Sequence, residues 1–194
     1  MPSLEPIAVV FGLANIALLI RRSIWNFPFA IAMVTLYAII FFQQRLYGEA
    51  GLQIFFAVVN LYGWSLWHRA GGAQSHVPVR WLGWRGRLGW LAFIAAGTVM
   101  LGTLLHRLTD AAMPYPDAAI AAASIAAQFL LSFRRIENWV LWIVIDIGAI
   151  ALYIVRDLHL TAGLYAVFLV LSVLGLREWM KAAVVRRESG GVPL

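Results

Sequence analysis

Seven apolar stretches, each 17 to 20 residues long, occupy most of this 194-residue chain and leave little room for other structure. A bilayer core about 30 Å thick requires roughly 20 apolar residues in a helix, with about 17 to 25 as the usual range. Hydrophobic residues form 62% of the chain and charged residues 12%, more apolar surface than one water-soluble globule can bury. We therefore predict an all-α integral membrane protein with seven transmembrane helices. The expected spans are 4–20, 26–43, 50–67, 88–105, 117–133, 138–155 and 161–180.

The basic residues indicate how these helices are oriented, because cytoplasmic loops of membrane proteins collect Lys and Arg. With seven spans, 12 of the 15 basic residues fall on one side, and only Arg45, Arg107 and Arg156 fall on the other. This asymmetry predicts an external N-terminus and a cytoplasmic C-terminus. It also accounts for the net charge of +6, so that no nucleic-acid partner is expected.

Tryptophan and arginine alternate in the stretch VPVRWLGWRGRLGW at residues 77–90, which we expect to lie at the level of the lipid headgroups. Tryptophan is enriched at both membrane surfaces, where its ring is amphipathic enough to sit between lipid and water. Four tryptophans near the ends of the expected spans are therefore interpreted as interface anchors. They are Trp67, Trp81, Trp84 and Trp179.

An internal repeat appears when the sequence is shifted on itself by 112 residues. Apolar matches mean little in a membrane protein, but Arg22 with Arg134, Asn26 with Asn138, Gly63 with Gly175 and Trp67 with Trp179 also coincide. The chain is thus read as one membrane domain, residues 1–194, built as 3+1+3 helices. Its parts are a first three-helix repeat at 4–67, a linker helix at 87–105 and a second repeat at 117–181. One intervening helix makes the repeats parallel, a known transporter plan that places the substrate between the repeats. The SWEET sugar carriers share this plan.

Polar residues form stripes along several of these helices and mark a candidate cavity. At helical pitch Asn138, Trp142 and Asp146 share one face of the sixth helix, at i, i+4 and i+8. Polar groups within a membrane normally face the bundle interior or a cavity, because unsatisfied groups in hydrocarbon are costly. The remaining candidates lie on the second, third and fifth helices. They are Tyr37, Gln53, Asn60, Trp64 and Gln128.

A structural interpretation stands beside each of these assignments. Amides and hydroxyls also join helices by hydrogen bonds without touching a substrate. Trp139 lies near the start of its helix and fits either a membrane interface or a binding pocket. Asp146 differs from the amides, since a carboxylate deep in a helix pairs with a substrate or an ion, or serves as a hydrogen-bond hub.

The side chains in the stripes constrain the ligand. Indole rings offer stacking faces to an aromatic heterocycle and attract cations, while amides and a phenol suit sugar hydroxyls. A phosphate would require basic residues in the cavity, and no Lys or Arg lies in the middle of an expected helix. The stripes therefore favour an unphosphorylated, nucleoside-like molecule, neutral or cationic.

Two motifs resemble the nicotinamide riboside transporter family of bacteria, the PnuC type. One is LYGEAGLQ (46–53) followed by NLYGWSLW (60–67), and the other is ENWVLWIVIDIGAIALY (137–153). The second resembles the E-x-W-x-x-W-x-x-x-D pattern of that family and is the more specific. The resemblance implies a SWEET-like transporter in the bacterial inner membrane, forming a homotrimer and working by facilitated diffusion. It also implies a cytoplasmic kinase that phosphorylates and traps the substrate, most directly nicotinamide riboside. Relatives that carry thiamine, riboflavin or deoxynucleosides are the alternatives.

Facilitated diffusion agrees with the residues themselves, because a proton-coupled carrier normally has a relay of buried acids or histidines, and Asp146 stands almost alone. A membrane enzyme is disfavoured, since no nucleophile–base pair occurs at depth. No metal or cofactor is expected, because the chain lacks cysteine and its four histidines have no ligand spacing. A non-transporting membrane subunit remains the alternative from another class; in it the polar stripes would only join helices.

Overall fold

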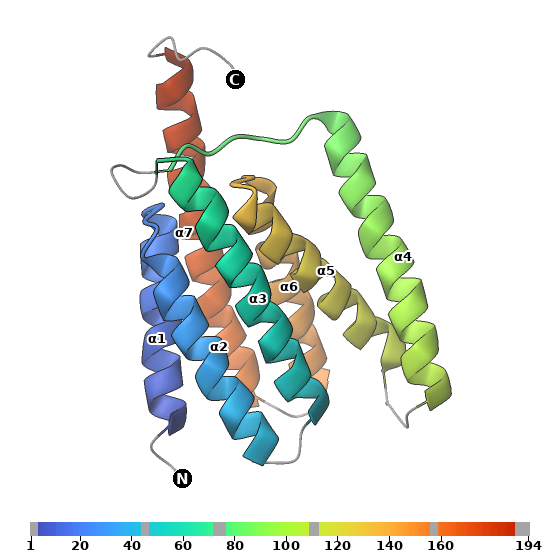
Figure 1. Cartoon of the computed structure of the whole chain (residues 1–194). Coiled ribbons are helices and arrows are strands. Elements are labelled where there is room, and N and C mark those ends of the chain that lie inside the picture. Colours follow the sequence, from blue (N-terminus) through green and yellow to red (C-terminus); the bar gives the residue numbers. More distant parts are fainter. Residues whose placement is uncertain (1–3, 44–46, 72–76, 109–112, 156–158, 189–194) are drawn as a thin grey trace. The chain divides into compact units, whose positions relative to one another are not determined.

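The computed structural model describes residues 4–43, 47–71, 77–108, 113–155 and 159–188, and within these ranges all long elements are helices (Figure 1). The described turns after Ile20, Arg69 and Ser132 carry arginine or glycine, as the sequence predicts. Their bounds are α1 Leu4–Ile20, α2 Asn26–Gln43, α3 Tyr47–Arg69, α4 Trp84–Leu108, α5 Pro114–Ser132, α6 Glu137–Val155 and α7 His159–Glu188. The prediction of an all-α chain with seven helices is confirmed for the described residues.

Four of these helices are long and apolar enough to cross a bilayer, judged by length and composition. They are Asn26–Gln43, Ala50–Arg69, Trp84–Leu108 and Ala162–Val184. The apolar part of α1, Pro6–Ile20, is shorter. Exposed Leu, Ile, Val and Phe side chains are abundant on the described surface, as expected where lipid is the solvent.

The helix bounds follow the apolar stretches closely. Helices α1 and α2 coincide with the spans expected at 4–20 and 26–43. Helix α7 extends to Glu188, beyond the end expected for the last span at residue 180. Residues 181–188 read KAAVVRRE, without glycine or proline, so nothing in this stretch stops the helix.

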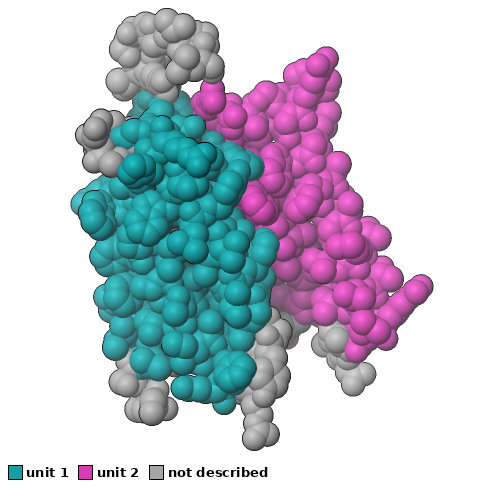
Figure 2. Space-filling view, viewed as in Figure 1, with its two compact units in different colours: residues 1–79, 132–134, 178–194 teal, residues 80–131, 135–177 magenta. Residues whose placement is uncertain are grey.

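Unit 1 is the first of two compact units, which Figure 2 colours separately, and comprises residues 1–79, 132–134 and 178–194. In it α1 packs against α2, and α2 packs against α3. The ring of Phe27 meets the ring of Trp67 edge to face, with centroids 5.2 Å apart. Trp179 lies 6.0 Å from Trp67 and donates its indole N–H to the carbonyl of Leu19 at 3.1 Å.

The interpretation of Trp67 and Trp179 as interface anchors is therefore wrong. Both side chains are 0% exposed and belong to the core of unit 1. A tryptophan that finds a hydrogen-bond acceptor inside the protein has no need of the wet membrane surface. Trp84, by contrast, is 67% exposed, as an anchor should be.

Unit 2 comprises residues 80–131 and 135–177. Its helices approach each other where small residues allow it. A Cβ atom on Gly102 of α4 would lie 2.4 Å from the ring of Tyr115 on α5. A Cβ atom on Gly175 of α7 would lie 2.5 Å from the ring of Trp139 on α6. These glycines let an aromatic ring lie directly on a neighbouring helix backbone, a frequent device in membrane helix packing.

The turns before α2 and α6 share one conformation. Arg22 and Arg134 both have left-handed backbones, with φ of 56° and 60°. The next N–H then donates to the carbonyl five residues back, from Ser23 to Leu18 at 3.0 Å and from Arg135 to Leu130 at 2.8 Å. This is the Schellman arrangement that satisfies the last carbonyls of a helix. The two turns lie 112 residues apart, the offset of the sequence repeat.

An asparagine amide completes each of these turns. The side-chain N–H of Asn26 donates to the carbonyl of Ser23 at 2.7 Å, and that of Asn138 donates to the carbonyl of Arg135 at 2.6 Å. Both asparagines are buried. The Arg and Asn matches in the sequence thus correspond to a turn built twice in the same way, while the extent of the three-helix repeats stays a prediction.

Gly175→Ala is expected to destabilise the protein by about 1 to 2 kcal/mol, because the added methyl overpacks the ring of Trp139. Gly163→Ala in the same helix is the matched control, since its Cβ would meet nothing within 4 Å. Alanine should there be neutral or stabilising by up to about 1 kcal/mol. Thermal unfolding of the two variants in detergent measures the difference, and equal melting temperatures would contradict the packing argument.

Candidate substrate site on the α6 face

The α6 face that carries Asn138, Trp142 and Asp146 is polar along its length and largely covered. Asn138 is 0% and Asp146 3% exposed, while Trp142 between them is half-buried. Asn138 lies in the first turn of α6 and Asp146 in its middle. The structure thus keeps the three residues on one helical face, with the indole as the most accessible of the three.

The Asp146 carboxylate has a partner on α7. The Ser172 hydroxyl donates to Asp146 Oδ2 at 3.0 Å, and both residues are buried. A hydroxyl that donates to a carboxylate favours its charged form and fixes its orientation. The pairing joins residues 26 positions apart, so no local sequence pattern predicts it.

Asn138 has a structural task that the sequence did not reveal. Its amide N–H holds the carbonyl of Arg135, while its Oδ1 is buried and has no hydrogen-bond partner among the described residues. Buried acceptors without partners are uncommon, so this oxygen is a candidate acceptor for a ligand. Contact between Asn138 and a substrate stays a prediction.

Trp139 and Gln128 are both buried in unit 2. The side chain of Trp139 is 2% exposed and lies against Gly175, so of the two interpretations open for this residue the membrane interface is wrong. Gln128 on α5 is 8% exposed. Their contact with a substrate is untested and stays a prediction.

The candidates of unit 1 lie on α2 and α3. Asn60 is 5% exposed and donates its amide to the carbonyl of Phe56 at 2.8 Å within its own helix. Gln53 and Trp64 on the same helix are half-buried. Tyr37 on α2 is half-buried and stacks on Phe41, with centroids 5.7 Å apart. A common cavity for these residues and the α6 face stays a prediction.

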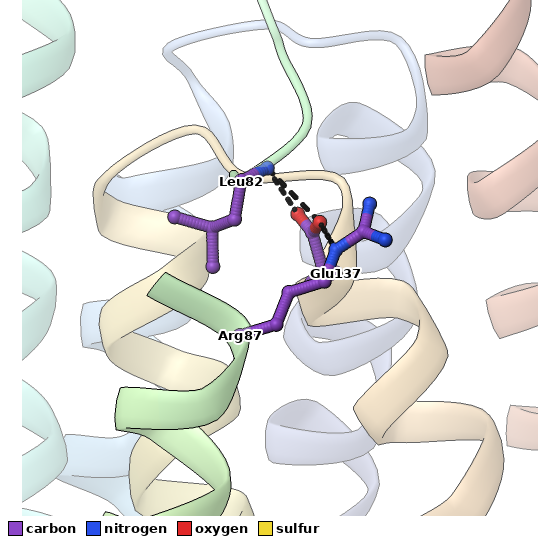
Figure 3. Close-up of polar contacts among 3 residues, drawn as sticks. All are labelled: Leu82, Arg87 and Glu137. Atoms are coloured by element: carbon purple, nitrogen blue, oxygen red, sulfur yellow. Dashed lines mark hydrogen bonds and ion pairs between the residues drawn. The ribbon is translucent and has the colours of Figure 1, made fainter. Parts of the chain in front are cut away.

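Glu137, the first residue of α6, forms a contact that we did not expect from the sequence (Figure 3). Its two carboxylate oxygens accept the Leu82 N–H at 2.9 and 3.0 Å, and Oε1 also accepts Arg87 Nε–H at 2.9 Å. The Glu137 side chain is 12% exposed and that of Arg87 51%. The start of α4 is thereby tied to the start of α6.

The backbone reinforces this connection. Arg80 and Arg135 form a parallel β-bridge, and the N–H of Ile136 donates to the carbonyl of Arg80 at 3.2 Å. Burial and the nearby Arg80 guanidinium lower the pKa of Arg135, while the Glu137 carboxylate raises it. We call the group Arg80, Arg87, Arg135 and Glu137 the arginine cluster.

No group of three or more His, Asp or Glu side chains comes together to hold a metal in the part of the chain that the structure describes. The site chemistry that is visible consists of one carboxylate, amides, a hydroxyl and indole rings. Groups of these kinds are suited to binding a small molecule through stacking and hydrogen bonds.

Comparisons with known proteins cover almost the whole chain. The family described as nicotinamide mononucleotide transporter matches residues 3–181. The nicotinamide riboside transporter PnuC of Escherichia coli (strain K12) is 29% identical, over 96% of this chain and 87% of its own. The PnuC of Neisseria mucosa is 33% identical, over 96% and 74%.

Two further comparisons concern a relative named for a different ligand and a solved structure. The riboflavin/roseoflavin transporter RibM of Streptomyces davaonensis is 31% identical, over 93% of this chain and 84% of its own. A crystal structure of the vitamin B3 transporter PnuC superposes with a TM-score of 0.74 at 29% identity, covering 93% of this chain and 81% of that one. From the family match and these relatives together, the chain belongs to the nicotinamide mononucleotide transporter family of multi-pass membrane transporters.

Proposed function

We propose that this protein carries nicotinamide riboside across the bacterial inner membrane by facilitated diffusion. The observation that carries the proposal is the α6 face, with a half-buried indole between a buried amide and a buried carboxylate, in a chain similar over 96% of its length to two carriers named for that substrate. Nicotinamide riboside combines a cationic aromatic ring with ribose hydroxyls. An indole face, an amide and a carboxylate complement those features.

Each residue of the α6 face has a role in this proposal. Trp142 stacks on the pyridinium ring, Asn138 Oδ1 accepts a hydrogen bond from the carboxamide or a ribose hydroxyl, and Asp146 balances the positive charge. Trp139 shapes the wall behind them. The remaining substrate contacts are assigned to Tyr37, Gln53, Asn60, Trp64 and Gln128.

Transport then proceeds by alternating access between the two three-helix repeats, 4–67 and 117–181, with 87–105 as linker. The turns at Arg22 and Arg134 support this division, because their conformations and hydrogen bonds repeat at the same offset. A cytoplasmic kinase phosphorylates the transported substrate. The added negative charge prevents its return, because the site has no basic residue in the middle of a helix to bind a phosphate. The assembly in the membrane is a homotrimer.

Riboflavin is the second candidate substrate, because RibM is 31% identical over 93% of this chain. Its flavin is neutral and larger than a pyridinium ring, so it gains from stacking on indole but not from a charge on Asp146. Thiamine and deoxynucleosides complete the set of alternatives.

Uptake of labelled substrate by proteoliposomes that contain this protein as their only protein tests the proposal. We expect saturable uptake of nicotinamide riboside down its gradient, unaffected by a proton gradient. Asp146→Asn should weaken uptake of this cation more than uptake of riboflavin, because only the cation loses a charge partner. Faster uptake of riboflavin than of nicotinamide riboside would reassign the substrate. If nicotinamide riboside, riboflavin, thiamine and deoxynucleosides were all not taken up, the result would favour a non-transporting subunit.

The orientation is a separate prediction. A tag after Leu194 should be protected inside spheroplasts, and one before Met1 should be accessible, because the Lys- and Arg-rich loops remain in the cytoplasm. Impermeant labelling of the two tags, with a periplasmic and a cytoplasmic protein as references, measures this. Two termini on the same side would overturn the seven-span arrangement.

A further inference from the structure

The arginine cluster concentrates positive charge at the beginning of α4. Arg80 and Arg135 are bridge partners in a parallel arrangement, so their side chains leave the backbone on the same side. Two guanidiniums held side by side repel each other, and binding of an anion lowers this repulsion. Their electrostatic coupling lowers the pKa of Arg135, after the larger effect of burial.

The cluster contains a single carboxylate. Both carboxylate oxygens of Glu137 accept the Leu82 N–H, and Oε1 also accepts the Nε–H of Arg87 (Figure 3). Three arginines and one glutamate leave the cluster with a net charge of +2. The arginine side chains are exposed or half-buried, so an anion can reach them from the surface of unit 2.

Exposed apolar side chains begin directly beside the cluster. Trp84, Leu88 and Leu91 lie on one face of α4, at i, i+4 and i+7, and are 67%, 55% and 58% exposed. Within the apolar part of α4, only 6% of the residues are buried inside the protein. Arg85 and Arg87 stack over the rings of Trp84 and Trp81, at 5.5 and 5.4 Å. Basic groups and indoles at the end of an apolar helix are typical of the region where lipid headgroups meet the hydrocarbon core.

We propose that the arginine cluster binds the phosphate of an anionic phospholipid, whose acyl chains lie along Trp84, Leu88 and Leu91. A guanidinium holds a phosphate through two parallel hydrogen bonds, and two neighbouring guanidiniums relieve their mutual repulsion by sharing one anion. A free phosphate could contact only the arginines, whereas the acyl chains of a phospholipid can also contact the adjoining apolar face. The combination therefore identifies a lipid with a negatively charged headgroup, independently of the transported substrate.

Lipid binding to the purified full-length protein tests this proposal. Native mass spectrometry in detergent, with phosphatidylglycerol or phosphatidylcholine added, gives a dissociation constant for each lipid. We expect wild type to prefer phosphatidylglycerol by at least about tenfold, and Arg80→Gln/Arg135→Gln to bind it about 30-fold more weakly, at roughly 1 kcal/mol per basic residue. Phosphatidylcholine binding should not change. The variant keeps the Arg80 carbonyl and the Ile136 N–H, so the backbone bridge remains.

Arg107→Gln, in the last turn of the same helix, is the matched control and should retain wild-type affinity. Wild type that binds both lipids equally, or a double variant that binds phosphatidylglycerol like wild type, would overturn the proposal without any question of folding. Competition separates the two sources of phosphate. Millimolar inorganic phosphate or glycerol 3-phosphate should not displace the lipid, and displacement would reassign the cluster to a soluble phosphoester.

Discussion

Replacing Trp142 by alanine should weaken nicotinamide riboside binding by at least about 30-fold, or 2 kcal/mol, the scale of a central aromatic contact in a binding site. The half-buried indole is the largest accessible group between Asn138 and Asp146. Stacking of a ring on tryptophan gains about 0.5 to 2 kcal/mol beyond burial, most for a desolvated cation. Trp142→Phe keeps a ring at the same place and should retain part of the affinity. Isothermal titration in detergent measures both variants.

Trp25→Ala provides the control for this experiment, because Trp25 is 64% exposed and lies just before α2. Its loss removes an indole of the same size that is not among the proposed site residues, and affinity should stay at the wild-type level. Melting temperatures near that of wild type would show that both alanine variants are folded. Wild-type affinity in Trp142→Ala would refute the proposed site.

Removing the Glu137 carboxylate should cost about 2 to 3 kcal/mol of stability in Glu137→Ala, since hydrogen bonds to charged groups contribute about 1.5 to 3 kcal/mol. Most of this loss comes from the Leu82 N–H, which is left without its acceptor. The ion pair adds less, because the Arg87 side chain is 51% exposed and water screens it. Glu137→Gln retains one oxygen acceptor and should lose about half as much. Thermal unfolding in detergent gives the order of the variants.

Lys181→Gln is the comparison for the Glu137 variants. It breaks the ion pair with Glu178. The Lys181 side chain is 72% exposed and that of Glu178 is 51% exposed. Such exposed pairs contribute about 0 to 1 kcal/mol, so little change is expected. If Glu137→Ala unfolded at the same temperature as Lys181→Gln, the connection between α4 and α6 would not be stabilising.

The helices can be predicted from the sequence because membrane spans are specified locally, by runs of apolar residues. The breaks around Arg22 and Arg134 are visible for the same reason, and the repeated Arg and Asn indicate by themselves that the two turns are equivalent. The face of α6 follows from periodicity alone. Each of these features can be found within one segment, or by comparing two segments, without knowing how the helices pack.

Contacts between distant segments cannot be predicted in this way. Glu137 meets Leu82 and Arg87 across 55 and 50 residues, and nothing in the local pattern of either segment specifies the other. The position of Trp179 near a helix end fits an interface anchor, whereas its acceptor, Leu19, lies 160 residues away. The structural task of Asn138 is hidden for a related reason, since the Arg135 carbonyl it holds is a backbone group that carries no side-chain signal.

The bond from Trp179 to Leu19 sets an order on biosynthesis. Helices α1 to α3 leave the ribosome first, but the core around Trp67 and the Leu19 carbonyl is closed by an indole from α7. At about 5 to 20 residues per second, the 160 residues between them take roughly 8 to 32 s to synthesise. During that interval the Trp179 indole is not yet available to the Leu19 carbonyl, so this core can be completed only after α7 has been synthesised.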